Sequence, residues 1–147
     1  MLTKLRAVLE RKGPTVHSVA PEASVLDAVR AMNAGRIGAL LVRDGEAVVG
    51  IFTERDVLCR VVDQGHDPAT TPVATVMTRD VITVRPDTTV EEAMSVISEK
   101  RCRHLPVLEG DQLKGLVSIG DLTRWVTRKQ AFHIQDLINY ITGKYPV

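Results

Sequence analysis

The stretch Gly115-Leu-Val-Ser-Ile-Gly-Asp121 has the pattern of a strand that runs directly into a helix. Its Leu116 and Val117 favour a β-strand, and the residues from 122 to 126 begin an apolar stripe at helical spacing. The serine and the aspartate, three residues apart, therefore stand where a helix begins. Their oxygens can cap that helix by accepting hydrogen bonds from free backbone N–H groups. They can instead hold a vicinal diol such as a ribose, because a carboxylate accepts hydroxyl hydrogen bonds. Taken alone, the pattern favours capping, since such caps are common.

The same arrangement occurs twice. Gly50-Ile-Phe-Thr-Glu-Arg-Asp56 precedes it at an offset of 65 residues (115 − 50), and no gap is needed to align the two halves. Further residues match at this offset: Val16 with Val81, Val19 with Val84, Pro21 with Pro86, Val25 with Val90, Ala28 with Ala93, Arg36 with Arg101, Leu40 with Leu105, Val42 with Val107 and Gly45 with Gly110. An ungapped repeat with only two copies predicts two similar subdomains packed together.

Composition narrows the class of protein. The 147 residues suffice for one compact domain, and the hydrophobic (44%) and charged (25%) fractions are ordinary for a soluble protein. A net charge of +1 gives no overall field that would attract nucleic acid or a membrane surface. No apolar run is long enough to span a bilayer, and the first ten residues do not form a secretory signal. We therefore expect a cytoplasmic protein with no membrane association and no nucleic-acid partner.

Local motifs of catalysis and metal binding are missing from the sequence. The two cysteines, Cys59 and Cys102, form no framework spacing and are predicted to be small buried hydrophobes. The four histidines are far apart and make no metal-binding pattern. No nucleophile–base arrangement, Walker loop or Gly-x-Gly-x-x-Gly motif occurs. The sequence thus predicts neither an enzyme nor a metal site.

The expected elements follow the same order in both halves. Strands are predicted at 16–19, 38–43 and 47–52, and again at 81–84, 104–108 and 112–117. Helices are predicted at 2–11, 24–35, 53–62, from 89 past 97, and from 120 into a tail that reaches 142. Pro106 must occupy a place in its strand where no ladder donor is needed, at an edge or a bulge.

The chain divides into three segments on this interpretation. Residues 1–65 hold the N-terminal helix and the first repeat, 66–130 hold a linker and the second repeat, and 131–147 form a helical tail. The fold class is mixed α/β (α+β). In the tail, Ile134, Leu137, Ile138 and Ile141 recur at helical spacing, and such a stripe needs a partner surface.

This doubled order resembles the tandem CBS-domain pair, also called a Bateman module. The resemblance rests on six motifs: Val19-x-Pro-x-x-x-Val-x-x-Ala28, Val84-x-Pro-x-x-x-Val-x-x-Ala93, Gly38-Ala-Leu-Leu-Val42, Arg103-His-Leu-Pro-Val107, Gly50-x-x-Thr-x-x-Asp56 and Gly115-x-x-Ser-x-x-Asp121. It covers roughly residues 12–128. The tail Tyr140-Ile-Thr-Gly-Lys-Tyr-Pro146 also resembles the C-terminal tail of stand-alone pairs of this kind. The family's fold implies two βαββα units packed sheet to sheet about a pseudo-twofold axis, and a homodimer.

The resemblance also implies two clefts between the repeats that bind adenosyl ligands. The expected ligands are AMP, ADP, ATP or NAD(H), with S-adenosylmethionine less favoured, and the sequence leaves open a mononucleotide or a dinucleotide. The first implied site contains Ser118, Gly120 and Asp121 at the ribose, Lys12, Thr15 and His17 near the base or phosphate, Ile37, Gly38 and Ala39 along the adenine, and Arg103 and His104 at phosphate oxygens. The second contains Thr53, Arg55, Asp56, Thr78, Asp80, Ile82, Cys102 and Arg103.

Simpler roles remain open for several of these residues. Asp121 can serve as a cap alone, Arg55 and Arg103 can be surface charges, and His104 can be a satisfied strand histidine. The leading hypothesis is a regulatory module that binds an adenine nucleotide and acts, as a homodimer, on a separate protein. The alternative is a constitutive interaction or scaffold dimer whose clefts are vestigial and whose tail helix docks a partner.

Overall fold

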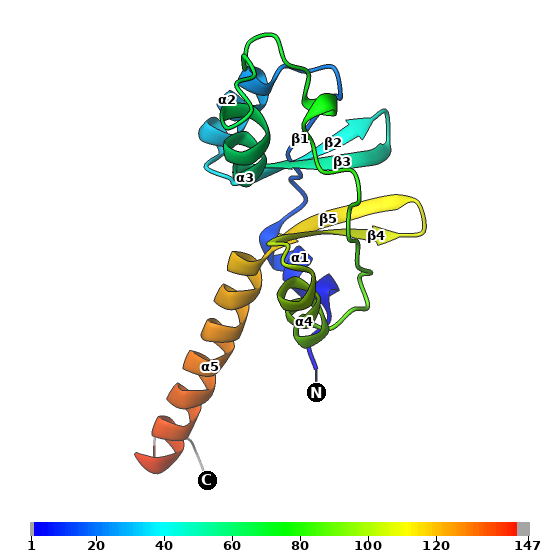
Figure 1. The fold of residues 1–147 in the computed structure, drawn as a ribbon. Coiled ribbons are helices and arrows are strands. Elements are labelled where there is room, and N and C mark those ends of the chain that lie inside the picture. Colours follow the sequence, from blue (N-terminus) through cyan, green and yellow to red (C-terminus); the bar gives the residue numbers. More distant parts are fainter. Residues whose placement is uncertain (1, 144–147) are drawn as a thin grey trace.

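The computed structural model describes residues 2–143 and shows two similarly built units, one stacked on the other (Figure 1). The first unit contains β1 (Ser18–Val19), α2 (Val25–Gly35), β2 (Ala39–Asp44), β3 (Ala47–Thr53), α3 (Glu54–Asp56) and the π-helical segment η1 (Val57–Val62). The second contains α4 (Val90–Lys100), β4 (His104–Glu109), β5 (Gln112–Ser118) and α5 (Ile119–Ile141). Before the first unit lies α1 (Leu5–Lys12), and the 3₁₀ turn η2 (Val73–Thr75) lies between the units. The predicted mixed α/β fold with two repeats is confirmed.

Each unit is built on an antiparallel hairpin. β2 pairs with β3, and β4 pairs with β5, while β1 lies parallel to β2. Both hairpins carry a register shift, one between Val42 and Arg43 and the other between Val107 and Leu108. The two shifts stand at equivalent places in the repeat, so the irregularity of the strands is repeated together with their sequence.

The strand predicted over 81–84 is wrong, since the structure gives this stretch an isolated parallel bridge between Val84 and Val107. Pro106 explains the difference. In the first unit, the N–H of Leu41 donates to the carbonyl of His17 at 3.2 Å. Pro106 occupies the position equivalent to Leu41 and has no N–H to donate. The equivalent carbonyl, that of Ile82, therefore loses its ladder donor, and the parallel pairing stops at Val84.

The helix predicted over 53–62 is divided into α3 and η1, and its apolar stripe is only partly buried. Val61 is fully buried, whereas Leu58 and Val62 are 65% and 63% exposed. Two apolar side chains of this segment therefore face solvent. The predicted end of the preceding helix at Gly35 is confirmed, and Arg36, in the left-handed conformation (φ 52°), caps α2 there.

Each unit has its own apolar core, and a third apolar cluster lies between the two sheets. The core of the second unit includes Leu5 and Val8 of α1, although this helix precedes the first unit in the sequence. The core of the first unit correspondingly includes Val73 of η2. Between the sheets, buried Leu41 of β2 packs in a cluster that Leu116 of β5 joins. This contact confirms that the two sheets face each other.

Helix α5 leaves the body of the molecule. Its first turns pack on the second core through Leu122 and Trp125, and the rest of the helix projects outward (Figure 1). The predicted tail is therefore continuous with the last helix of the second repeat. Its apolar side chains are 45–80% exposed: Ile134, Leu137, Ile138 and Ile141. The last four residues of the tail, 144–147, lie outside the described residues. Among residues 2–143, no helix is both long enough and apolar enough to cross a membrane.

Candidate functional site

The two hydroxyl–aspartate turns form reciprocal caps. The N–H of Asp121 donates to the Ser118 hydroxyl at 3.1 Å, and the N–H of Ser118 donates to Oδ2 of Asp121 at 2.9 Å. Thr53 and Asp56 exchange the same pair of hydrogen bonds, at 3.2 and 3.0 Å. The predicted capping role is therefore confirmed in both repeats. Each cap also fixes its carboxylate at the junction of a strand and a helix, with Oδ2 turned toward the backbone N–H that it satisfies.

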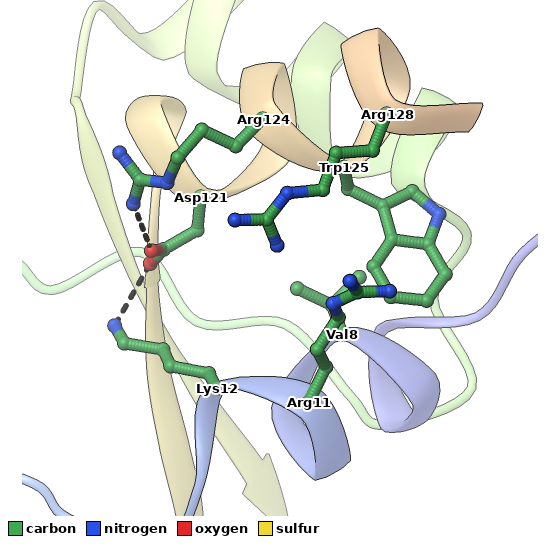
Figure 2. A pocket seen from close by; sticks show the side chains of 7 residues that line it. All are labelled: Val8, Arg11, Lys12, Asp121, Arg124, Trp125 and Arg128. Atoms are coloured by element: carbon green, nitrogen blue, oxygen red, sulfur yellow. Dashed lines mark hydrogen bonds and ion pairs between the residues drawn. The ribbon is translucent and has the colours of Figure 1, made fainter. Parts of the chain in front are cut away.

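Asp121 has two further partners, both cations (Figure 2). Nζ of Lys12 lies 2.8 Å from Oδ2, and Nη2 of Arg124 lies 2.7 Å from Oδ1. Lys12 also donates to the carbonyl of Leu116 at 2.6 Å, which fixes its ammonium beside the turn. Lys12 is the last residue of α1 and Asp121 lies in the first turn of α5, so the contact joins the first helix to the start of the last one. The predicted grouping of Lys12, Ser118 and Asp121 is thus present in the structure.

The Asp121 side chain is only 11% exposed, yet it remains ionised. Burial alone would raise the pKa of this carboxyl, but the Lys12 ammonium and the Ser118 N–H outweigh burial and hold the pKa below its ordinary value. An ionised carboxylate is the acceptor that a pair of sugar hydroxyls needs.

His104 lies across the β4–β5 ladder from Ser118, at the edge of the same site. Burial, reinforced by the charge of Lys12, lowers the pKa of His104 below its ordinary value. The imidazole is therefore neutral near pH 7. It could reach a phosphate as a neutral N–H donor, and it supplies no charge there.

Gly38 lies beside Glu54 within the first unit. A Cβ built on Gly38 would lie 3.2 Å from the carboxyl group of Glu54, and the N–H of Glu54 donates to the Gly38 carbonyl at 3.0 Å. The charge of Glu54 acts against burial and tends to raise the pKa of His104. Glu54 was not among the residues predicted for this site. Its position in the capping turn, directly after Thr53, was the signal that could have identified it.

The other residues predicted for this first site are spread more widely. Ile37 packs on the core of the first unit, and Ala39 is buried in the layer between the sheets. His17 is exposed, and its Cε1 lies 3.4 Å from the position of a Cβ on Gly35. Thr15 and Arg103 are exposed as well. The structure thus gathers Lys12, His104, Ser118, Gly120 and Asp121 around the turn, whereas Gly38 lies beside Glu54 in the first unit.

The turn of the first repeat has a different environment. The Thr78 hydroxyl donates to both oxygens of Asp56, at 3.2 and 3.4 Å, and Nε of Arg60 lies 3.5 Å from Oδ1. Thr78 was predicted for this site, and Arg60 was not. Within residues 2–143, the side chains of the remaining predicted members form no hydrogen bond or ion pair with the Asp56 carboxylate: Arg55, Asp80, Ile82, Cys102 and Arg103.

The cysteines and histidines take no part in a metal site. In the part of the chain that the structure describes, no three His, Cys, Asp or Glu side chains gather closely enough to hold a metal ion. Both cysteines are free thiols. Cys102 is partly buried, and burial raises the pKa of its thiol. Cys59 is exposed on η1, so the prediction that it is buried is wrong.

Comparison with known proteins identifies the family. The family model of the CBS domain matches residues 12–63 and again residues 73–128. The chain therefore belongs to the CBS-domain family and carries two copies of the domain. CBS pairs are regulatory modules that often bind nucleotides.

Individual relatives agree with this assignment. The chain is 41% identical over 127 residues to the mitochondrial CBS domain-containing protein CBSX3 of Arabidopsis thaliana, covering 83% of this chain and 62% of that protein. It thus spans less than two thirds of the length of CBSX3. Among solved structures, the CBS-domain protein NE2398 shares 40% identity at a TM-score of 0.83, covering 86% of this chain and 99% of the other. A CBS-domain protein of Burkholderia ambifaria shares 41% identity at a TM-score of 0.81, covering 86% and 93%.

Proposed function

We propose that this chain is a cytoplasmic regulatory module that binds an adenine nucleotide at the Asp121 turn and acts, as a homodimer, on a separate protein. The observation that carries the proposal is the carboxylate of Asp121. It is held ionised and nearly buried, and it is fixed by a cap that leaves its oxygens shared with two cationic side chains. AMP, ADP, ATP and NAD(H) all present the diol that such a carboxylate accepts, and S-adenosylmethionine is a less favoured candidate.

Binding at this turn requires an exchange of partners. The two hydroxyls of a ribose would take over part of the Asp121 carboxylate, and the ammonium of Lys12 or the guanidinium of Arg124 would be released. A released cation would then lie beside the nucleotide's own phosphate, so that charge stays balanced at the site. The module needs no catalytic group for this role, and we assign it a sensory and not an enzymatic function.

Thermal unfolding with AMP, ADP, ATP, NAD⁺, NADH and S-adenosylmethionine tests the proposal. A ligand at about 100 times its Kd stabilises the folded state by ~2.7 kcal/mol, a shift of several degrees in Tm. Asp121→Ala should abolish the shift. Asp111→Ala, at an exposed position in the β4–β5 turn, is the matched control and should keep it. If Asp121→Ala binds every nucleotide as tightly as the wild type, Asp121 is a cap and the proposal fails.

Homodimerisation is a separate part of the proposal. Support comes from η1, where Leu58 and Val62 expose most of their apolar surface to solvent. Light scattering should give twice the mass of the chain. Replacing both residues by Gln should return the protein to the mass of one chain, and an unchanged dimer would place the interface elsewhere.

A scaffold function is the second candidate, and α5 favours it. The stripe of Ile134, Leu137, Ile138 and Ile141 lies on a helix that has left the body of the molecule, where the described chain does not cover it. If no nucleotide shifts the Tm, the scaffold function becomes the better interpretation. Charged substitutions at Leu137 and Ile138 would then be expected to abolish association.

A further inference from the structure

A cationic pocket lies on the α1–α5 side of the Asp121 turn. It has a volume of about 230 Å³ and is lined by Val8, Arg11, Lys12, Asp121, Arg124, Trp125 and Arg128. Figure 2 shows Arg11 and Lys12 reaching in from α1, and Arg124 and Arg128 from α5. Pockets for whole drug-sized ligands are usually larger, at roughly 300–1,000 Å³. The size therefore suits one part of a ligand better than an entire nucleotide.

The charges of this pocket are unbalanced. Four cationic side chains surround one carboxylate, and Lys12 and Arg124 already share that carboxylate. Arg11 and Arg128 have no ion pair within residues 2–143, and Figure 2 shows both guanidinium groups turned toward the space between Asp121 and Trp125. Arginine binds phosphate oxygens through two parallel N–H donors. The pocket therefore presents unused donors of the kind that phosphate groups accept.

The repeat supplies an internal comparison, because each pocket residue has an equivalent 65 positions away. Arg11 and Lys12 correspond to Val76 and Met77, and Arg124 and Arg128 correspond to Cys59 and Asp63. None of these four equivalent positions carries a positive charge, and the one cation that forms an ion pair with Asp56 among the described residues is Arg60, at the position equivalent to Trp125. The Asp56 turn consequently has a neutral hydroxyl, that of Thr78, in the neighbourhood where Asp121 meets Lys12.

We propose that the α1–α5 pocket binds the terminal phosphates of a nucleoside di- or triphosphate, and that the turn at Asp56 offers no equivalent site. This inference rests on the proposed function, since it assigns the phosphate end of a ligand whose ribose is held at Asp121. Lys12 and Asp121 line both regions and make them continuous. A nucleoside monophosphate would fill only the first region, so the pocket selects for ligands with two or more phosphates.

Isothermal titration of the whole chain with AMP, ADP, ATP and inorganic tripolyphosphate, without divalent cations, tests this inference. We expect ATP to bind at least about tenfold more tightly than AMP, at one site per chain. The double variant Arg11→Gln/Arg128→Gln should lower the affinity for ATP at least about tenfold and change that for AMP less than about twofold. The control Arg30→Gln/Lys100→Gln removes two exposed charges from α2 and α4 and should leave every affinity unchanged.

The outcomes separate this inference from the proposed function. Equal affinities for AMP and ATP would refute the assignment of terminal phosphates to the α1–α5 pocket, and so would an ATP affinity that the double variant leaves unchanged. Neither result would contradict nucleotide binding at Asp121. Two equivalent ATP sites per chain would overturn the asymmetry. If no nucleotide binds but tripolyphosphate binds through Arg11 and Arg128, the pocket is a polyphosphate site, and both the nucleotide proposal and the assignment of terminal nucleotide phosphates to the pocket fail. If tripolyphosphate does not bind either, both are wrong.

Discussion

Gly50 and Gly115 occupy equivalent places in the repeat, but the structure predicts different effects of an added methyl group. A Cβ on Gly50 would lie 2.5 Å from Sδ of Met77 and 2.9 Å from the backbone carbonyl of Thr78. A Cβ on Gly115 would lie 2.6 Å from Cδ2 of Leu9, the end of a flexible side chain. We therefore expect Gly50→Ala to displace backbone, whereas Gly115→Ala requires only a rotation of Leu9.

The magnitude follows from these contacts. Overpacking costs about 1–3 kcal/mol, and a clash with backbone belongs at the upper end, near ~3 kcal/mol. Replacing a strand glycine by alanine returns about 0.5–1 kcal/mol of conformational entropy. Gly50→Ala should thus destabilise the protein by about 2 kcal/mol, or about 4–8 °C in Tm for a chain of this size. For Gly115→Ala the two effects nearly cancel, so the expected change is within about 1 kcal/mol.

Urea unfolding of both variants measures the difference. The carbonyl of Thr78 accepts a hydrogen bond from the N–H of Ile51 at 2.9 Å, so its displacement should also expose the Ile51 amide to hydrogen exchange. Gly115→Ala is the control for a methyl group at the same strand position. Equal stability of Gly50→Ala and wild type, with the Ile51 amide still protected, would refute the argument from close approach.

Three further predictions concern pH and strand pairing. Because the pKa of His104 is lowered in the folded state, stability should fall as the pH drops below about 6.5, and His104→Gln should reduce this loss; parallel Tm–pH curves for variant and wild type would contradict it. The pKa of Asp121 is also lowered, so its contribution is present above about pH 3.9 and is lost at lower pH. The stability gap between wild type and Asp121→Asn should therefore narrow on acidification below that pH, and a constant gap in an acid titration would count against it. Pro106→Leu supplies the missing donor to the Ile82 carbonyl, and hydrogen exchange should show a protected amide at position 106; rapid exchange there would show that the proline is not what stops the ladder.

Much of the fold could be predicted because the two halves of the sequence can be compared with each other. The capping turns, the hairpins and the order of elements all recur at a fixed offset, so each copy supports the interpretation of the other. The failed strand at 81–84 shows the limit of such a comparison. One proline removes one donor, and pairing that depends on a neighbouring strand is lost although the local sequence still favours β-structure.

Exposure was harder to predict than periodicity. Leu58 and Val62 continue a helical apolar stripe, yet more than half of each side chain is exposed. An apolar stripe indicates that one face of a helix is buried, but it does not distinguish burial in the core of one chain from burial in an interface between chains. The same ambiguity applies to the projecting half of α5.

The site shows what the repeat alone leaves out. Ser118 and Asp121 have counterparts in Thr53 and Asp56, and this correspondence identified both turns. Arg124 and Arg128 have no cationic counterparts, so a search for matching positions passed over them.

Matching and departing positions carry different information for a physical reason. Positions that match specify backbone geometry, since a cap or a close approach places the same demand on both halves. Positions that differ between the repeats are not constrained by a shared backbone geometry. A cluster of such positions with one sign of charge therefore indicates a ligand that only one half binds. All four pocket cations lie on α1 and α5, and three of them, Arg11, Lys12 and Arg128, have an apolar or acidic residue at the equivalent position of the repeat. We expect the double variant at Arg11 and Arg128 to lose its discrimination between ATP and AMP. That result would mean that the residues that differ between the two repeats determine which nucleotide binds, whereas the residues that match determine only where the site lies.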